Sequence, residues 1–222
     1  MEEDYMAKRI SSILEEQERL SQTVQAMRKT DIRRYPGNYR VLSSEAARRS
    51  EQITCRLRHM VYETTDMDKT EYLLSAADAQ GVQIQRRGGV LEITLPGLVP
   101  KRRRRQNPEF LLDPFTAAMS RFVEEHDVPR YEHCVVCFAH VYDRKLSRYR
   151  VRDYDNLELK QLLDVATSFV MLDDSGLLCD AYYTTELGES DCTRMFIMDS
   201  RHFPVWLAER EKSITSIKDF SV

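Results

Sequence analysis

The first thirty residues place apolar side chains at alternating steps of four and three, with polar residues between them. This spacing puts them on one stripe of an α-helix over residues 4–30. After the helix-breaking segment 35–39, a second stripe with the same step begins near Ser44. We expect the two helices to form an antiparallel hairpin, with the stripes packed within the chain or against a second copy. The stripes contain Met6, Ile10, Ile13, Gln17, Leu20, Val24 and Met27, and then Ala46, Ser50, Ile53, Leu57 and Met60.

Beyond the hairpin, the sequence from Asp68 to Gly81 predicts a third helix, with Asp68 and Glu71 spaced as in a capping box. From Val82 the apolar period becomes two, which predicts a β-hairpin around Gly88-Gly89. The later elements are expected as a helix at 109–126, a strand at 133–142, a helix at 156–168, strands within 171–183 and 194–198, and a helix at 206–218.

This order, β-β-α-β-α-β-β-α, predicts an α+β fold with a mixed β-sheet and flanking helices. The fold is preceded by an α-helical N-terminal extension. We therefore divide the chain into a helical extension at 1–81, a sheet domain at 82–200 and a C-terminal helix at 201–222.

The composition is that of an ordinary globular protein, with 42% hydrophobic and 31% charged residues among 222. No stretch reaches the roughly 20 apolar residues of a membrane span, so we expect no membrane partner. The acidic start of the chain does not fit a signal peptide, and five cysteines are an odd number. Both observations favour reduced thiols and a cytoplasmic location. Cys134 and Cys137 have zinc-like spacing, but on a strand they would point to opposite faces, which favours a sheet strand.

A run of five consecutive cations interrupts a chain whose net charge is only −3. The run consists of Lys101, Arg102, Arg103, Arg104 and Arg105. It is compatible with contact to a DNA backbone, with a solvated loop, or with an address or lipid-binding patch.

Two groups of acidic residues flank the helix expected at 156–168. Asp153 and Asp155 precede it, and Asp173 and Asp174 follow it. On an extended segment, residues two apart point to the same side, so the first pair could face one ion. Carboxylates are the ligands that Mg²⁺ prefers, and their mutual repulsion is relieved by a cation. In the alternative interpretation, Asp155 or Asn156 caps the helix and the later pair forms a turn.

In their order along the chain, three motifs resemble the RusA family of Holliday junction resolvases over residues 90–200. A strand runs into Pro96-Gly97 and the basic segment Pro100-Lys101-Arg102. The motif Asp153-Tyr154-Asp155-Asn156 stands at a helix start, and Asp173-Asp174 follows that helix.

The resemblance implies a RusA-like, Mg²⁺-dependent endodeoxyribonuclease that acts as a homodimer on branched DNA. Its context would be recombination, repair or the replication of mobile elements. By the same resemblance, Asp153, Asp155 and Asp174 would bind the metal, and the cationic run would contact DNA. Lys160 is the candidate for the family's catalytic lysine, although it stands about one residue later than the family pattern.

Two other functions remain open from the sequence. The chain could keep the fold as a catalytically inactive DNA-binding or protein-interaction module. Alternatively, it could be a helical-hairpin scaffold whose acidic residues only cap helices and form turns. In either case the N-terminal helices could bind another protein or self-associate.

Overall fold

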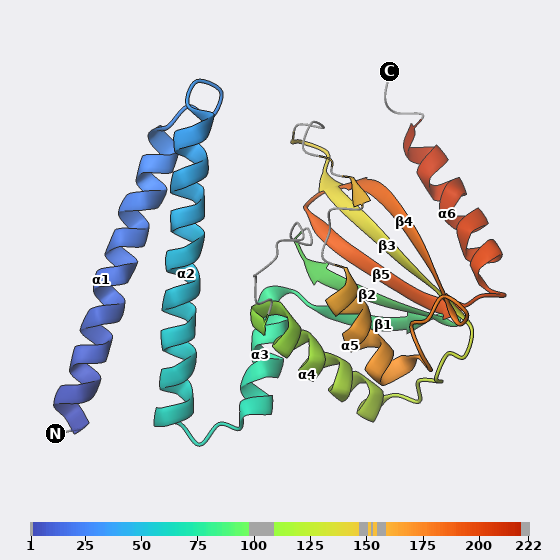
Figure 1. Cartoon of the computed structure of the whole chain (residues 1–222), viewed down its shortest axis with the longest axis horizontal. Coiled ribbons are helices and arrows are strands. Elements are labelled where there is room, and N and C mark those ends of the chain that lie inside the picture. The colour runs from blue at the N-terminus through green and yellow to red at the C-terminus, as the bar shows by residue number, and fades with distance from the viewer. Residues whose placement is uncertain (1, 98–108, 147–150, 152, 155–158, 219–222) are drawn as a thin grey trace. The chain divides into compact units, whose positions relative to one another are not determined.

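The computed structural model describes residues 2–97, 109–146, 151, 153–154 and 159–218. The chain divides into two compact units, Met1–Lys69 and Thr70–Val222. The first unit is helical, and the second contains a five-stranded sheet with helices around it (Figure 1). The expected α+β architecture with a mixed sheet and a helical N-terminal region is therefore confirmed.

The first unit is an antiparallel hairpin of α1 (Glu2–Lys29) and α2 (Pro36–Thr64) (Figure 1). Between the helices, the Asp31 carboxylate accepts hydrogen bonds from the backbone N–H groups of Arg33 and Arg34, at 2.8 and 3.2 Å. The second helix begins at Pro36, earlier than the start expected near Ser44. The expectation was wrong there because proline is well accommodated in the first turn of a helix, where its missing N–H has no acceptor to serve.

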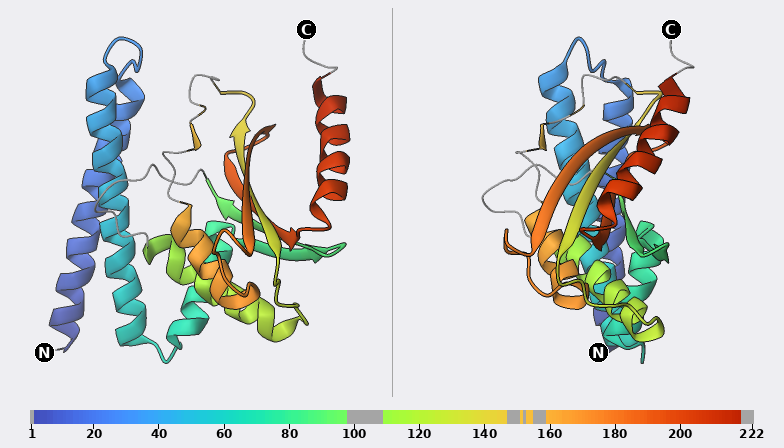
Figure 2. Two further views of the ribbon diagram at one scale, coloured as in Figure 1. Left: turned by 45° about the vertical axis from the view of Figure 1, so that its right-hand side comes forward. Right: turned by 90° about the vertical axis from the view of Figure 1, so that its right-hand side faces the viewer.

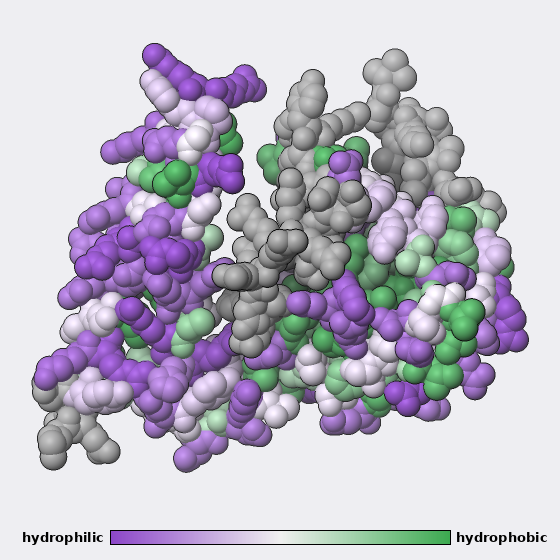
Figure 3. Space-filling model, viewed as in Figure 1, coloured by the Kyte–Doolittle hydropathy of each residue, from purple (hydrophilic) through white to green (hydrophobic). Residues whose placement is uncertain are grey.

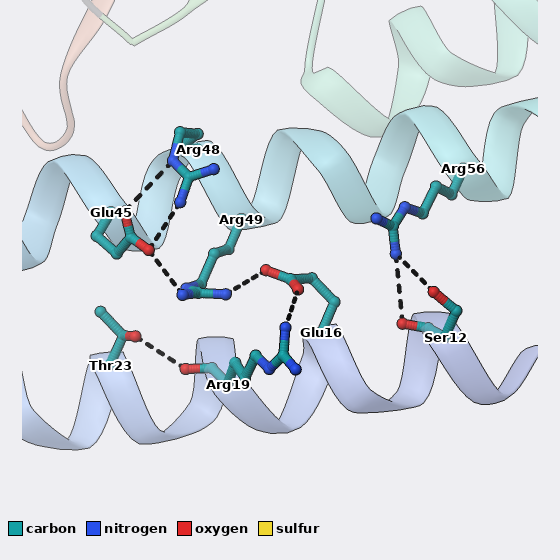
Figure 4. Close-up of polar contacts among 8 residues, drawn as sticks. All are labelled: Ser12, Glu16, Arg19, Thr23, Glu45, Arg48, Arg49 and Arg56. Carbon is teal, nitrogen blue, oxygen red and sulfur yellow. Dashed lines mark hydrogen bonds and ion pairs between the residues drawn. The ribbon is translucent and has the colours of Figure 1, made fainter.

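A buried carboxylate links the two helices of the hairpin. Glu16 on α1 is only 7% exposed and accepts hydrogen bonds from Arg49 on α2 and from Arg19 on its own helix. Arg49 also reaches Glu45 at 2.7 Å (Figure 4). A buried charge is costly unless it is paired, so this network favours one alignment of the helices over slipped alternatives.

The second unit is organised around one sheet with strand order β1-β2-β5-β3-β4. The β3–β4 pair is parallel, whereas the other neighbours are antiparallel. The elements are α3 (Lys69–Gln80), β1 (Gln83–Arg87), β2 (Val90–Pro96), α4 (Glu109–Glu125), β3 (Cys134–Asp143), α5 (Lys160–Val170), β4 (Cys179–Gly188), β5 (Cys192–Asp199) and α6 (Phe203–Lys218). This is the predicted order of elements.

Strand β3 has hydrophobic cores on both of its faces. Cys134, Val136 and Phe138 belong to the larger core, which includes residues of α3, α4 and α5. Cys137 belongs to a smaller core, against which Trp206 of α6 packs. Figure 2 shows α6 on the opposite side of the sheet from α4 and α5. The prediction that Cys134 and Cys137 point to opposite faces is confirmed, because each contributes to a different core.

A row of alternating charges runs across the sheet face that α6 covers. Arg194 on β5 bonds the Glu92 carboxylate of β2 and lies 3.4 Å from the Glu186 carboxylate of β4. Glu186 in turn accepts a hydrogen bond of 2.6 Å from Arg210 of α6. The row ties three strands and the last helix together through charge-assisted hydrogen bonds.

The division of the chain into units differs from the boundary expected at residue 81. Helix α3 lies in the same unit as the sheet, since that unit begins at Thr70. Leu73 and Ala77 of α3 are buried, and Ala77 belongs to the larger core. Helix α6 also lies in this unit, whereas the sequence pattern assigned it to a separate C-terminal segment. The spacing of apolar residues predicts that a short helix has an apolar face, but it does not identify the core against which that face packs.

None of the helices in the described part of the chain combines the length and hydrophobicity needed to cross a membrane.

Replacing Glu186 tests the row of charges under α6. In Glu186→Ala, Arg210, whose side chain is 9% exposed, loses its ion pair with Glu186. We expect the free energy of unfolding to fall by about 3 kcal/mol, the lower end of the cost of breaking a buried ion pair. Urea denaturation measures this change. Glu189→Ala removes an exposed carboxylate beyond the end of β4 and should have little effect; equal losses in the two variants would contradict a special role for Glu186.

The reactivity of the cysteines tests the burial of β3. Burial raises the pKa of the Cys137 thiol to about 12, so almost none of it is thiolate at neutral pH. Cys55 on α2 is exposed. With a chromogenic disulfide reagent, we expect Cys55 to react in the fastest phase and Cys137 to react only after unfolding. Persistence of the fastest phase in Cys55→Ser would show that another thiol is equally accessible.

Candidate functional site at the start of helix α5

Lys160 is the first residue of α5 and carries the ion pairs of the candidate site. Its Nζ lies 2.8 Å from Oδ1 of Asp164, one turn further along the same helix. It also lies 3.3 Å from Oδ2 of Asp174, in the loop between α5 and β4. The structure therefore brings together the predicted catalytic lysine and one of the three predicted metal-binding acids.

The loop that contains Asp174 folds back on itself. The backbone N–H of Asp174 donates a 2.8 Å hydrogen bond to the carboxylate of Asp173. The backbone oxygen of Ser175 accepts hydrogen bonds from the N–H groups of Leu178 and Cys179, each at 2.9 Å. The side chain of Asp174 is 27% exposed, whereas Asp173 is exposed. The loop thus forms the turn considered as an alternative, but it also directs Asp174 toward Lys160.

Tyr154, which precedes α5 in the chain, packs against the sheet. Its ring stacks on His140 of β3 and on Tyr183 of β4, with centroid distances of 5.7 Å in both cases. Its hydroxyl forms a 2.7 Å hydrogen bond with Oγ1 of Thr185 on β4. His140 is 1% exposed, so the stack reaches into the core. Because Tyr154 is held in this way, the backbone of Asp153 lies next to the sheet.

The remaining predicted site residues are Asp153, Asp155 and the cationic run. Asp153 is exposed. Asp155 lies outside the described residues, as does the whole DNA-binding segment Lys101, Arg102, Arg103, Arg104 and Arg105. Helix α5 begins at Lys160, and Leu159 occupies its N-cap position. Asp155 and Asn156, the N-cap residues expected in the alternative interpretation, lie outside the described residues.

The two carboxylates near Lys160 determine its charge. Hydrogen bonds to Asp164 first and to Asp174 second raise the pKa of Lys160 above its usual value of 10.5. The lysine is therefore an ammonium group at neutral pH. It can balance negative charge or donate a hydrogen bond, but it cannot act as a general base there.

The acidic side chains near Lys160 carry the kind of oxygen ligand that a hard cation such as Mg²⁺ binds. Asp153 and Asp174 offer carboxylate oxygens, the ligands that Mg²⁺ prefers, and a side chain that is 27% exposed can be reached from solvent. Within the described residues, however, no group of three or more His, Cys, Asp or Glu side chains is arranged to hold a metal ion. A Mg²⁺ site formed by Asp153, Asp155 and Asp174 therefore stays a prediction.

Two residues of the candidate site were not predicted from the sequence. Asp164 pairs with Lys160, and the spacing of four residues on a helix is the signal that indicates such a pair. Tyr154 anchors the acidic segment, but an aromatic residue between two acids gives no pattern that specifies its stacking partners. Those partners lie on β3 and β4, which only the folded sheet brings beside it.

Comparison with protein families places the chain in one family. The model of a family of unknown function, DUF6100, matches residues 2–221, and the chain belongs to this family. The match includes both the hairpin and the sheet unit. A comparison with curated proteins found no match.

The protonation of Lys160 can be measured directly. NMR titration of the Lys160 side chain should give a pKa above 10.5, and Asp164→Asn should lower it toward that value because the hydrogen bond to Asp164 contributes most to the shift. Since the folded-state pKa is raised, this pairing stabilises the fold fully below pH 10.5 and is lost as pH rises through the folded-state pKa. Glu71→Gln, on α3, is the control and should leave the titration unchanged. A wild-type pKa at or below 10.5 would contradict the pairing.

Proposed function

We propose that the sheet unit is a Mg²⁺-dependent, structure-selective endodeoxyribonuclease that resolves Holliday junctions or related branched DNA. Its biological context would be recombination, repair or the replication of mobile elements. The observation that carries the proposal is the 3.3 Å approach of Lys160 Nζ to Asp174 Oδ2. Two residues that the RusA resemblance singles out, fourteen positions apart, meet at one end of α5.

The proposed roles follow from the chemistry of the side chains. Asp153, Asp155 and Asp174 would hold the Mg²⁺ ion through carboxylate oxygens. A bound Mg²⁺ supplies Lewis-acid polarisation of a phosphate oxygen and lowers the pKa of a coordinated water. Lys160, as an ammonium group, would offset the negative charge that develops on the phosphate during cleavage.

We expect the stacked Tyr154 to help position Asp153 and Asp155, the acidic residues on either side of it. Its hydrogen bond to Thr185 of β4 and its stacking on His140 of β3 hold Tyr154 itself against the sheet. A carboxylate that is already positioned loses less conformational freedom when it binds its ligand, so Tyr154 is a positioning residue.

The cationic run and a two-fold assembly complete the proposal. Lys101 to Arg105 would contact the phosphate backbone, which gives affinity that falls with salt and carries no base sequence information. Symmetric cleavage of a four-way junction needs two active sites, so a homodimer is the matching assembly.

A second candidate function is a catalytically inactive module that binds DNA or another protein. One observation favours it: Lys160 pairs with both Asp164 and Asp174. The negative charge of Asp174 is then balanced by an internal cation, which reduces its need for a metal ion. Metal binding at Asp174 would have to compete with this pair.

Cleavage of a synthetic four-way junction separates the two functions. With Mg²⁺, the wild type should introduce paired nicks, whereas Asp155→Asn and Asp174→Asn should lower the rate by at least about 100-fold, as expected for lost metal ligands. Lys160→Met should lower the rate while leaving junction affinity nearly unchanged. Labelled junctions resolved on denaturing gels measure the rate, and mobility shift measures binding.

The control for these variants is Glu71→Gln, which changes an exposed carboxylate on α3. It should cleave at the wild-type rate. Junction binding without cleavage by the wild type, at any Mg²⁺ or Mn²⁺ concentration, would reject the nuclease and support the inactive module.

A further inference from the structure

The α1–α2 hairpin buries very little apolar surface for its length. Among its described residues, the buried hydrophobic side chains are Ile13 and Ala46. By contrast, Ile10, Leu14 and Leu57 are 47, 58 and 46% exposed. Two helices with so few buried contacts gain little from packing, and most helical stability in proteins comes from packing of an apolar face.

These three exposed residues lie along a groove between the two helices. Ile10, Leu14 and Leu20 line it from α1, and Ile53 and Leu57 line it from α2, around a volume of about 430 Å³. The side of the hairpin seen in Figure 3 is largely hydrophilic. A groove of this kind is half of a helical-bundle core that lacks its other half.

Charge is distributed unevenly along the hairpin. The loop end, residues 19–50, has eight Lys and Arg against two acidic residues, a net charge of +6. The open end, residues 1–18 with 51–68, has four Lys and Arg against ten acidic residues, a net charge of −6. Two hairpins aligned in the same direction would place like charges together, whereas two aligned in opposite directions would place each basic end beside an acidic end.

The polar residues of the groove agree with the opposed alignment. Gln17 on α1 and Ser50 on α2 line the groove and lie close to the midpoints of their helices. A two-fold axis relating two opposed hairpins passes through that middle level. There, Gln17 of the two copies can meet and satisfy each other, as polar residues do when they set the alignment of a helical bundle.

We infer that the hairpin is a dimerisation element, in which the grooves of two copies face each other in opposite directions and form a four-helix bundle. This inference is independent of the proposed nuclease activity, because it rests on residues 1–68 alone. It assigns a role to the N-terminal unit and identifies the partner as a second copy of this chain.

The oligomeric state of the full chain tests the inference. Sedimentation equilibrium at about 0.1 M salt should show a dimer. Leu14→Glu places a charge in the groove and should shift the chain to monomer, with at least about a 100-fold weaker dimer. Leu177→Glu introduces the same residue at a position that is 89% exposed in the sheet unit, and it should remain dimeric. A monomeric wild type, or a Leu14→Glu variant as dimeric as the wild type, would overturn the inference.

A second variant tests the charge argument without altering the groove. Arg33 and Arg34 are exposed in the loop, and their backbone N–H groups, not their side chains, donate the hydrogen bonds to Asp31. The double variant Arg33→Glu/Arg34→Glu should therefore fold normally, as circular dichroism would verify. Its dimer should be about tenfold weaker than wild type at 0.1 M salt and no different at 1 M salt, where exposed charges are screened. Equal dimer strength at low salt would contradict the opposed alignment.

A distance measurement determines the direction of the hairpins. Each helix is about 40 Å long at 1.5 Å per residue. Spin labels at Tyr35→Cys, in a Cys55→Ser background, mark the loop end of each copy. Opposed hairpins place the two labels about 40 Å apart, and pulsed electron resonance measures this distance. Labels closer than about 20 Å would mean that the hairpins run in the same direction, which would overturn the inference.

Discussion

The structure of the sheet unit depends on the burial of β3 from both faces. Nine of its ten residues are buried, and it forms hydrogen-bonded ladders with β4 on one side and β5 on the other. A strand in this position must present apolar side chains in both directions, because neither face meets water. The helices α4 and α5 cover one face and α6 covers the other. The candidate site depends on this arrangement, because Tyr154 stacks on His140 of β3 and Tyr183 of β4.

The secondary structure of the chain follows from local patterns, but the pairing of its strands does not. The changes of period near residues 82 and 109 fall where β1 and α4 begin. The placement of β5 between β2 and β3 could not be read in this way. The ion pair between its Arg194 and Glu92 of β2 joins residues 102 positions apart, and apolar alternation is the same whichever neighbouring strand it pairs with. The assignment of α3 to the sheet unit was missed for a similar reason, since its burial depends on a distant core.

The candidate site was predictable in its chemistry and only partly in its geometry. The Lys160–Asp164 pair is implied by a spacing of four on one helix. The contact between Lys160 and Asp174 depends on where α5 begins. In the sequence, Lys160 stands about one residue later than the RusA pattern places its lysine, but α5 starts at Lys160 itself. Since Lys160 is the first residue of the helix, its direction cannot be extrapolated from a helix that was expected to begin at residue 156. The position of Lys160 relative to the loop after α5 is therefore a property of the fold.

The wide sequence separation between β2 and β5 has a consequence for synthesis of the chain on the ribosome. The β1–β2 hairpin needs only local contacts, so it can form early. Strand β2 then waits with one edge unpaired until residues 192–199 emerge, because β5 fills that edge. During this interval the exposed edge is a template for pairing with another nascent chain. Completion of the sheet, rather than formation of its helices, is thus the step at which a nascent chain is most exposed to misassembly.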